Sequence, residues 1–108
     1  MNENWKICIK NPFLNCEKIY PIQQRKVREL IDDILKNSES VKKIVVFGSS
    51  VTSRCHIGSD IDIYCETDNG KVKLTEPFDF VYDLWTNSTV DSRMKEEIQR
   101  KGVVVYES

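Results

Sequence analysis

The hydrophobic positions of this chain change their period along the sequence, which predicts alternating helices and strands. Between residues 21 and 37, apolar side chains recur every three or four positions, as they do on one face of a helix. A second, shorter stripe consists of Val90, Met94 and Ile98. Gly102 follows this stripe at the position where a helix cap is expected. We therefore expect one long helix before the central strands and one short helix after them.

Short apolar or alternating runs predict the strands. The expected strands are Val41–Phe47, Asp60–Glu66, Phe78–Trp85 and Val103–Tyr106. A short helix is expected over residues 49–54, and residues 86–89 form a turn with a helix cap. The turn signal at residues 68–70 suggests that residues 71–74 pair back as a hairpin arm. Together these elements predict an α/β fold, with helices packed on a small mixed sheet.

Composition limits the classes of protein to which the chain can belong. Its 108 residues suffice for one domain, which we place at residues 21–108, after a weakly patterned arm of residues 1–20. No apolar run approaches the roughly 20 residues of a membrane span, and the first residues lack the apolar segment of a signal peptide. We therefore expect a cytoplasmic protein with no membrane contact.

The formal net charge of -1, without a basic stripe, argues against nucleic acid as a partner. The four cysteines form no C-x-x-C pair, which argues against a zinc site.

The most specific pattern is Gly48–Ser49 followed, after ten residues, by Asp60 and Asp62. The two aspartates lie two residues apart on a predicted strand, so they share one face of the sheet. Carboxylates placed in this way can bind hard divalent cations, typically Mg²⁺. A Gly–Ser turn that opens a helix offers backbone N–H groups and a hydroxyl to a phosphate. Ser50 and Arg54 are further candidates for phosphate contacts, although Arg54 could equally be a solvated cation at a helix end. The pattern predicts a site for a metal-bound nucleoside triphosphate.

This pattern resembles the minimal nucleotidyltransferases of the DNA polymerase β-like superfamily. Their hallmark is an apolar strand, a Gly–Ser pair, about ten residues, Asp-x-Asp, and a third acid on a later strand. In this chain the hallmark occupies Ile44–Ser49 and Ser59–Ile63, and the closing stretch from Tyr82 to Tyr106 also looks like the end of such a domain. The resemblance covers about residues 41–106. It implies the polymerase β-like nucleotidyltransferase fold.

The resemblance also implies roles for the acidic residues. Asp60 and Asp62 would be catalytic metal ligands for two ions, Mg²⁺ or, as the alternative, Mn²⁺. The third acid would be a metal ligand or the general base for the incoming hydroxyl. Asp79 and Asp83 share one face of the predicted strand, and both are candidates. We favour Asp83, because it lies deeper in the strand and 19 residues before Gly102, a spacing like that of the family.

The function implied by the resemblance is transfer of a nucleoside monophosphate, with AMP from ATP as the leading choice, to an acceptor hydroxyl. Minimal members often accompany small helical HEPN-type toxins. The implied acceptor is therefore a tyrosine of such a partner, and the chain would be an antitoxin that acts as a protein adenylyltransferase. Two alternatives stay open. One is a non-catalytic nucleotide- or partner-binding antitoxin module, and the other is a small-molecule nucleotidyltransferase similar to those that modify aminoglycosides. The nucleotide base, the acceptor and the oligomeric state are not determined by the sequence.

Overall fold

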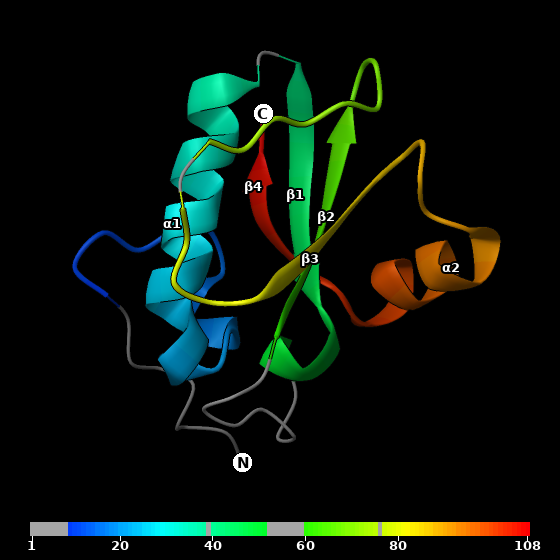
Figure 1. Cartoon of the computed structure of the whole chain (residues 1–108). Helices are drawn as coiled ribbons and strands as arrows, with labels where there is room; N and C mark the ends of the chain where they lie inside the picture. Colours follow the sequence, from blue (N-terminus) through cyan, green and yellow to red (C-terminus); the bar gives the residue numbers. More distant parts are fainter. Residues whose placement is uncertain (1–8, 39, 52–59, 76) are drawn as a thin grey trace.

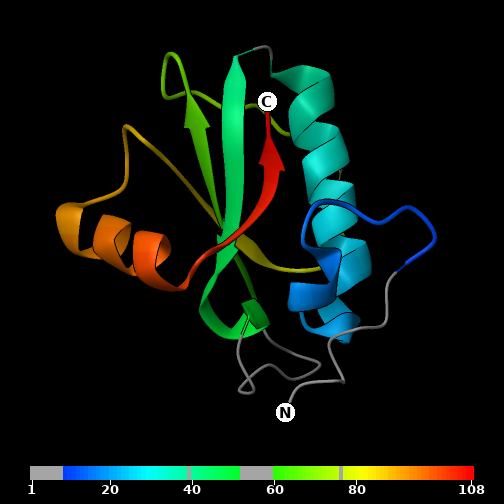
Figure 2. The ribbon, with the colours of Figure 1, turned by 180° about the vertical axis from the view of Figure 1, so that it is seen from behind.

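The computed structural model describes residues 9–38, 40–51, 60–75 and 77–108. Its elements are η2 (Cys16–Lys18), α1 (Pro21–Asn37), β1 (Val41–Phe47), η3 (Gly48–Val51), β2 (Ile61–Thr67), β3 (Tyr82–Thr86), α2 (Ser92–Lys101) and β4 (Val103–Glu107). The strands form one mixed sheet in the order β3–β2–β1–β4. Strand β1 is antiparallel to β2 and to β4, whereas β2 and β3 are parallel. The two α-helices lie on opposite sides of the sheet (Figures 1 and 2), which confirms the predicted α/β class.

The central strand β1 is buried on both faces. On the side of α1, Ile44 and Val46 belong to the larger core, which contains the apolar stripe of the helix. On the other side, Val45 and Phe47 pack with Ile98 of α2. Because successive side chains of a strand point to opposite faces, burial on both sides requires a continuous apolar run rather than an alternating one. This explains the sequence of β1, whose predicted bounds are confirmed, as are those of α1.

Strand β3 is shorter than predicted. It begins at Tyr82, and residues 78–81, which the alternation placed in the strand, are not part of it. Pairing with β2 begins where the N–H of Ile61 donates to the carbonyl of Val81 at 3.2 Å. The apolar members of the alternation are still used, because the Phe78 and Phe80 rings pack together, with centroids 5.1 Å apart, against the larger core. The alternating pattern is thus satisfied by a segment that bends at residues 79 and 80 and packs its aromatic rings on the core without forming a strand.

The prediction that residues 71–74 pair back as a hairpin arm is wrong. These residues form no strand and lie instead along the end of α1. The N–H of Lys73 donates to Ser38 Oγ at 3.0 Å, and the N–H of Thr75 donates to Asp33 Oδ2 at 2.8 Å. The backbone donors that a hairpin would have paired are therefore satisfied by side chains of the helix and of the residue that follows it.

Helix α2 begins later than predicted, and its cap is not in residues 86–89. Those residues do form a turn, but the cap is Asp91, whose Oδ1 accepts from the N–H of Met94 at 2.8 Å. Gly102 does follow the helix, as predicted. Its φ of -71° is not left-handed, so the backbone conformation does not require glycine. Glycine is required because there is no room for a side chain. A Cβ at this position would lie 2.5 Å from the carbonyl oxygen of Ile98 and from a methyl group of Val45.

The described part of the N-terminal arm, residues 9–20, packs against the rest of the chain. Cys16 and Ile19 are buried there. The side chain of Gln24 on α1 donates to the carbonyl groups of both residues, at 3.0 Å each. Within the described residues, no helix has the length and apolar character needed to cross a membrane.

Candidate active site

Three of the predicted site residues, Asp60, Asp62 and Asp83, are related by strand pairing and by charge, and we call them the acidic cluster. Asp62 on β2 is in register with Phe47 on β1 and with Asp83 on β3. Residues paired in this way point to the same face. Phe47 belongs to the cluster under α2, so the two carboxylates lie on that side of the sheet. Asp60 is exposed and precedes β2 by one residue.

The electrostatics of Asp62 reflect its burial and the other carboxylates of the site. The pKa of Asp62 is raised from 3.8 to about 6, first by burial and then by the negative charges of Asp83, Asp60 and Glu97, in that order. Phe47, which is in register with Asp62, is buried, and its ring centroid lies 5.7 Å from that of Trp85. The side chain of Asp62 is thus half-buried, and the charges of described residues that shift its pKa are all negative.

The backbone of the Gly–Ser turn comes directly against Asp62. Gly48 has a φ of +77°, which is in the left-handed region that favours glycine. A Cβ at this position would overlap Oδ2 of Asp62. Gly48 is therefore required both by its conformation and by the carboxylate. This contact joins the predicted phosphate-binding turn to the acidic cluster.

The other predicted phosphate-binding residues differ in their placement. The predicted helix after Gly48 begins as a single 3-10 turn over residues 48–51. Ser49 is half-exposed on this turn. Ser50 is completely buried, and its Oγ lies 3.4 Å from Nε2 of Gln23, a placement that favours a structural role for its hydroxyl. Arg54 lies outside the described residues.

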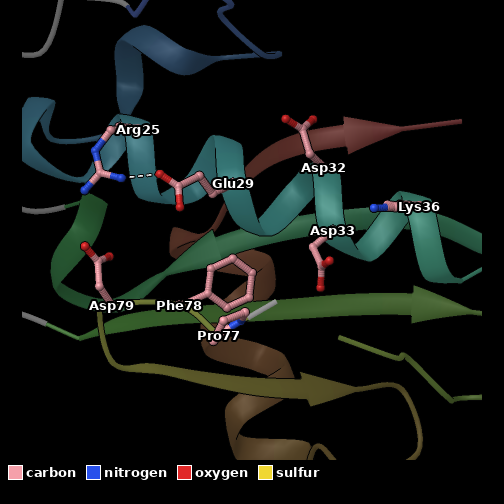
Figure 3. Close-up of a pocket in the computed structure, with 8 residues that line it drawn as sticks. All are labelled: Arg25, Glu29, Asp32, Asp33, Lys36, Pro77, Phe78 and Asp79. Carbon is pink, nitrogen blue, oxygen red and sulfur yellow. Dashed lines mark hydrogen bonds and ion pairs between the residues drawn. The ribbon is translucent and has the colours of Figure 1, made fainter. Parts of the chain in front are cut away.

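Asp79, the alternative third acid, is not beside Asp62. It precedes β3 and lies on the side of α1, at a pocket of about 520 Å³ (Figure 3). The pocket is lined by Arg25, Glu29, Asp32, Asp33, Lys36, Pro77, Phe78 and Asp79. It contains none of the three clustered acids. The structure therefore brings Asp83, rather than Asp79, next to Asp62, while the catalytic role of either residue stays a prediction.

The donor chemistry of the cluster suits a divalent cation. Carboxylate oxygens are the preferred ligands of Mg²⁺, and the raised pKa of Asp62 reflects burial and, after it, negative charge that a cation would neutralise. Over the described ranges, however, no three or more His, Cys, Asp or Glu side chains are grouped closely enough to hold a metal ion. Metal binding by Asp60, Asp62 and Asp83 therefore stays a proposal.

Sequence reasoning did not single out two residues near this site. Glu97 is exposed on α2, and its charge acts on Asp62. In the sequence, Glu97 is marked only by its position next to Ile98, at the margin of the apolar stripe. This position does not distinguish Glu97 from other exposed acids. Gln23 is fully buried next to Ser50. A polar residue at a buried helix position indicates that its side chain has a hydrogen-bond partner. The sequence does not identify that partner, because Ser50 is 27 residues away.

The comparisons with known proteins concern the fold and the family of this chain rather than its individual site residues. The family model described as a nucleotidyltransferase domain matches residues 27–105. A crystal structure of a mutant of the toxin–antitoxin complex MntA–HpeT superposes on this chain with a TM-score of 0.60 and 15% sequence identity, over 75% of this chain and 73% of that chain. No curated protein matches the sequence. The structural likeness confirms the predicted fold, and the extent of the family match shows that the chain belongs to the nucleotidyltransferase domain family.

Proposed function

We propose that this protein transfers a nucleoside monophosphate, AMP from ATP, to an acceptor hydroxyl. The acceptor oxygen forms a bond to the α-phosphorus, the bond from that phosphorus to the bridging oxygen breaks, and pyrophosphate leaves. The observation that carries the proposal is the placement of Asp62 in register with Asp83, with the backbone of Gly48 against its carboxylate. Membership of the nucleotidyltransferase domain family supports the reaction class.

Each residue of the cluster has a role in this proposal. Asp60 and Asp62 would hold two divalent ions, Mg²⁺ or Mn²⁺, which neutralise charge on the attacking and leaving oxygens when bound. Asp83 would complete the site or accept the proton of the acceptor hydroxyl. The N–H groups of the turn at Gly48 and Ser49 would bind the phosphates. Phosphoryl transfer depends mainly on positioning and charge neutralisation, so this small set of groups suffices.

We propose that the acceptor belongs to a partner protein. The support is the structural likeness to MntA–HpeT, which is itself a toxin–antitoxin complex. By this analogy the chain would be an antitoxin and a protein adenylyltransferase, and the acceptor would be a tyrosine hydroxyl of a small helical HEPN-type toxin.

The test is mass spectrometry of candidate acceptors after incubation with this protein, ATP and Mg²⁺. The candidates are the protein itself, the product of the neighbouring gene and an aminoglycoside. We expect one AMP to be added to the neighbouring protein. The addition should be absent with the Asp60→Ala, Asp62→Ala double variant and present with Asp79→Ala, which removes a carboxylate outside the cluster. Addition to the aminoglycoside alone would instead identify a small-molecule transferase. ATP binding without modification of any acceptor would favour a non-catalytic binding module.

A further inference from the structure

We propose that residues 13–20 form a clamp that holds the Gly48–Ser49 turn in position for the phosphates of the nucleotide. The inference rests on the proposed function, because it assigns these residues a part in nucleotide binding. The clamp lies before residues 27–105, the part of the chain that the family model matches. Its role is therefore inferred from contacts of this chain and not from the family.

The clamp contacts the turn directly through Ser50. The N–H of Tyr20 donates to the carbonyl of Ser50 at 2.9 Å. Gln23, in the first turn of α1, places its side-chain Nε2 at 3.4 Å from Ser50 Oγ, and its own N–H donates to the carbonyl of Tyr20 at 2.8 Å. Ser50 and Gln23 are completely buried, so neither contact competes with water. Because Ser50 lies two residues after Gly48 on a single 3-10 turn, a shift of Ser50 also moves the backbone against Asp62.

The clamp is itself fixed to two other elements. The side-chain Nε2 of Gln24 donates to the carbonyls of Cys16 and Ile19, which joins the clamp to α1. The side-chain Nδ2 of Asn15 donates to the carbonyl of Val104 on β4 at 2.8 Å. Asn15 has a φ of 60°, a left-handed conformation that asparagine adopts more readily than most residues. Because these hydrogen bonds fix the clamp to α1 and β4, the clamp can restrain the position of the turn.

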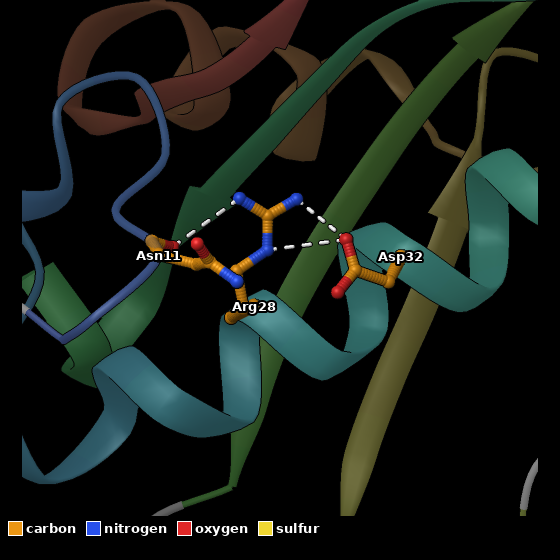
Figure 4. A network of polar contacts seen from close by, with 3 residues as sticks. All are labelled: Asn11, Arg28 and Asp32. Carbon is orange, nitrogen blue, oxygen red and sulfur yellow. Dashed lines mark hydrogen bonds and ion pairs between the residues drawn. The ribbon is translucent and has the colours of Figure 1, made fainter.

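The residues just before the clamp are also tied to α1. Arg28 donates from one guanidinium nitrogen to the carbonyl of Asn11 at 3.4 Å, and its other two nitrogens donate to Asp32 Oδ1 at 2.6 and 3.1 Å (Figure 4). The same guanidinium lies 5.9 Å from the ring of Phe13. Since Asp32 lies one turn further along the same helix, it orients Arg28 towards the arm.

A phosphate-binding turn benefits from such support because its N–H groups bind best when they need no ordering on binding. Here η3 has only four residues, and its first residue has a positive φ. A single 3-10 turn contains few internal hydrogen bonds of its own. The contact from Tyr20 therefore supplies a restraint that the turn does not generate locally.

The experiment compares Tyr20→Pro with Tyr20→Ala. Proline removes the N–H that donates to Ser50, while alanine removes the same side chain and keeps that N–H. The backbone already suits proline, because Tyr20 has a φ of -55° and the preceding Ile19 is extended, at φ -99° and ψ 136°. Three quantities are measured: the amide hydrogen exchange of a peptide that covers residues 48–51, the KM for ATP, and kcat.

Relative to Tyr20→Ala, we expect Tyr20→Pro to exchange about fivefold faster at residues 48–51 and to raise the KM for ATP about fivefold, the size expected for loss of one hydrogen bond. We expect kcat to change less than KM, because the acidic cluster is left intact. Equal exchange and equal KM in the two variants would overturn the proposal. Faster exchange with an unchanged KM would also overturn it, because the contact would then be structural only.

A second variant keeps the test decisive if Tyr20→Pro does not fold. Asn15→Gly removes the amide that anchors the clamp to β4 and still permits a φ of 60°. We expect the same direction of change in exchange and in KM, and no change in either would contradict the clamp. If the wild-type protein binds no ATP, the proposed function fails. The exchange data then decide separately whether residues 13–20 hold the turn.

Discussion

Replacing Asp62 by Asn should stabilise the fold at neutral pH, because the wild-type carboxylate is ionised in a half-buried site beside other carboxylates. Its pKa is raised from 3.8 to about 6 in the folded state. Between these two values the folded protein binds more protons than the unfolded chain, so stability falls as pH rises through this window and is lowest above it. The full shift of about two pH units corresponds to about 3 kcal/mol at about 1.4 kcal/mol per unit. Screening by solvent at a half-exposed side chain reduces this to about 1 kcal/mol.

The assay is urea or thermal unfolding of the wild type and of Asp62→Asn at pH 4 and at pH 7, without divalent cations. At pH 7 we expect the variant to be more stable by about 1 kcal/mol, or roughly 4 °C in Tm for a domain of this size. At pH 4 the two proteins should differ much less, because the wild-type carboxyl is then mostly protonated. Asp79→Asn is the matched control, since it removes an exposed carboxylate outside the cluster. A variant that is equally stable or less stable at pH 7, or a difference that does not depend on pH, would refute the reasoning.

Three further predictions follow from the same geometry. Millimolar Mg²⁺ should raise the Tm of the wild type by a few degrees and that of Asp62→Asn much less, as measured by thermal unfolding. Gly48→Ala should destabilise the protein by about 1–3 kcal/mol, because the new Cβ would overlap Asp62 Oδ2 at a positive φ, and titration with ATP should show weaker binding. Asp33→Ala should cost about 2–3 kcal/mol in urea unfolding, because the buried carboxylate accepts from the N–H and the hydroxyl of Thr75, while ATP affinity should be unchanged.

The parts of this fold that sequence reasoning predicted are those determined by local periodicity. The bounds of α1 and β1 follow from their apolar positions. Of the two aspartates predicted to share a strand, only Asp62 lies on β2, because the strand begins at Ile61, after Asp60. The choice between Asp79 and Asp83 depended on where the strand begins. The alternating pattern does not reveal where the strand begins. Residues 78–81 follow the pattern because Phe78 and Phe80 pack on the core, although these residues form no strand.

The features that sequence reasoning missed depend on partners that are distant along the chain. The donor at Thr75 finds Asp33, which is 42 residues away, so the expected hairpin does not form. Ser50 resembled a phosphate ligand because it follows Gly48 and Ser49, but its partner Gln23 comes from the buried start of α1. In each case a polar group had two possible partners, and the packing of α1 decided between them. Local patterns carry no information about that choice.

The contacts of Asp62 explain why the proposed cation site would also carry a cost in stability. Burial and the neighbouring carboxylates, first of all Asp83 on β3, raise its pKa, and the backbone of Gly48 lies against the same side chain. Moving the acids apart or exposing Asp62 would relieve the repulsion, but it would also separate the carboxylates from the Gly–Ser turn. The energetic cost of crowding is therefore inseparable from the proposed site. Elements that do not depend on the acids must offset it, and these are the doubly buried β1 and the hydrogen bonds that join residues 13–20 to α1 and β4.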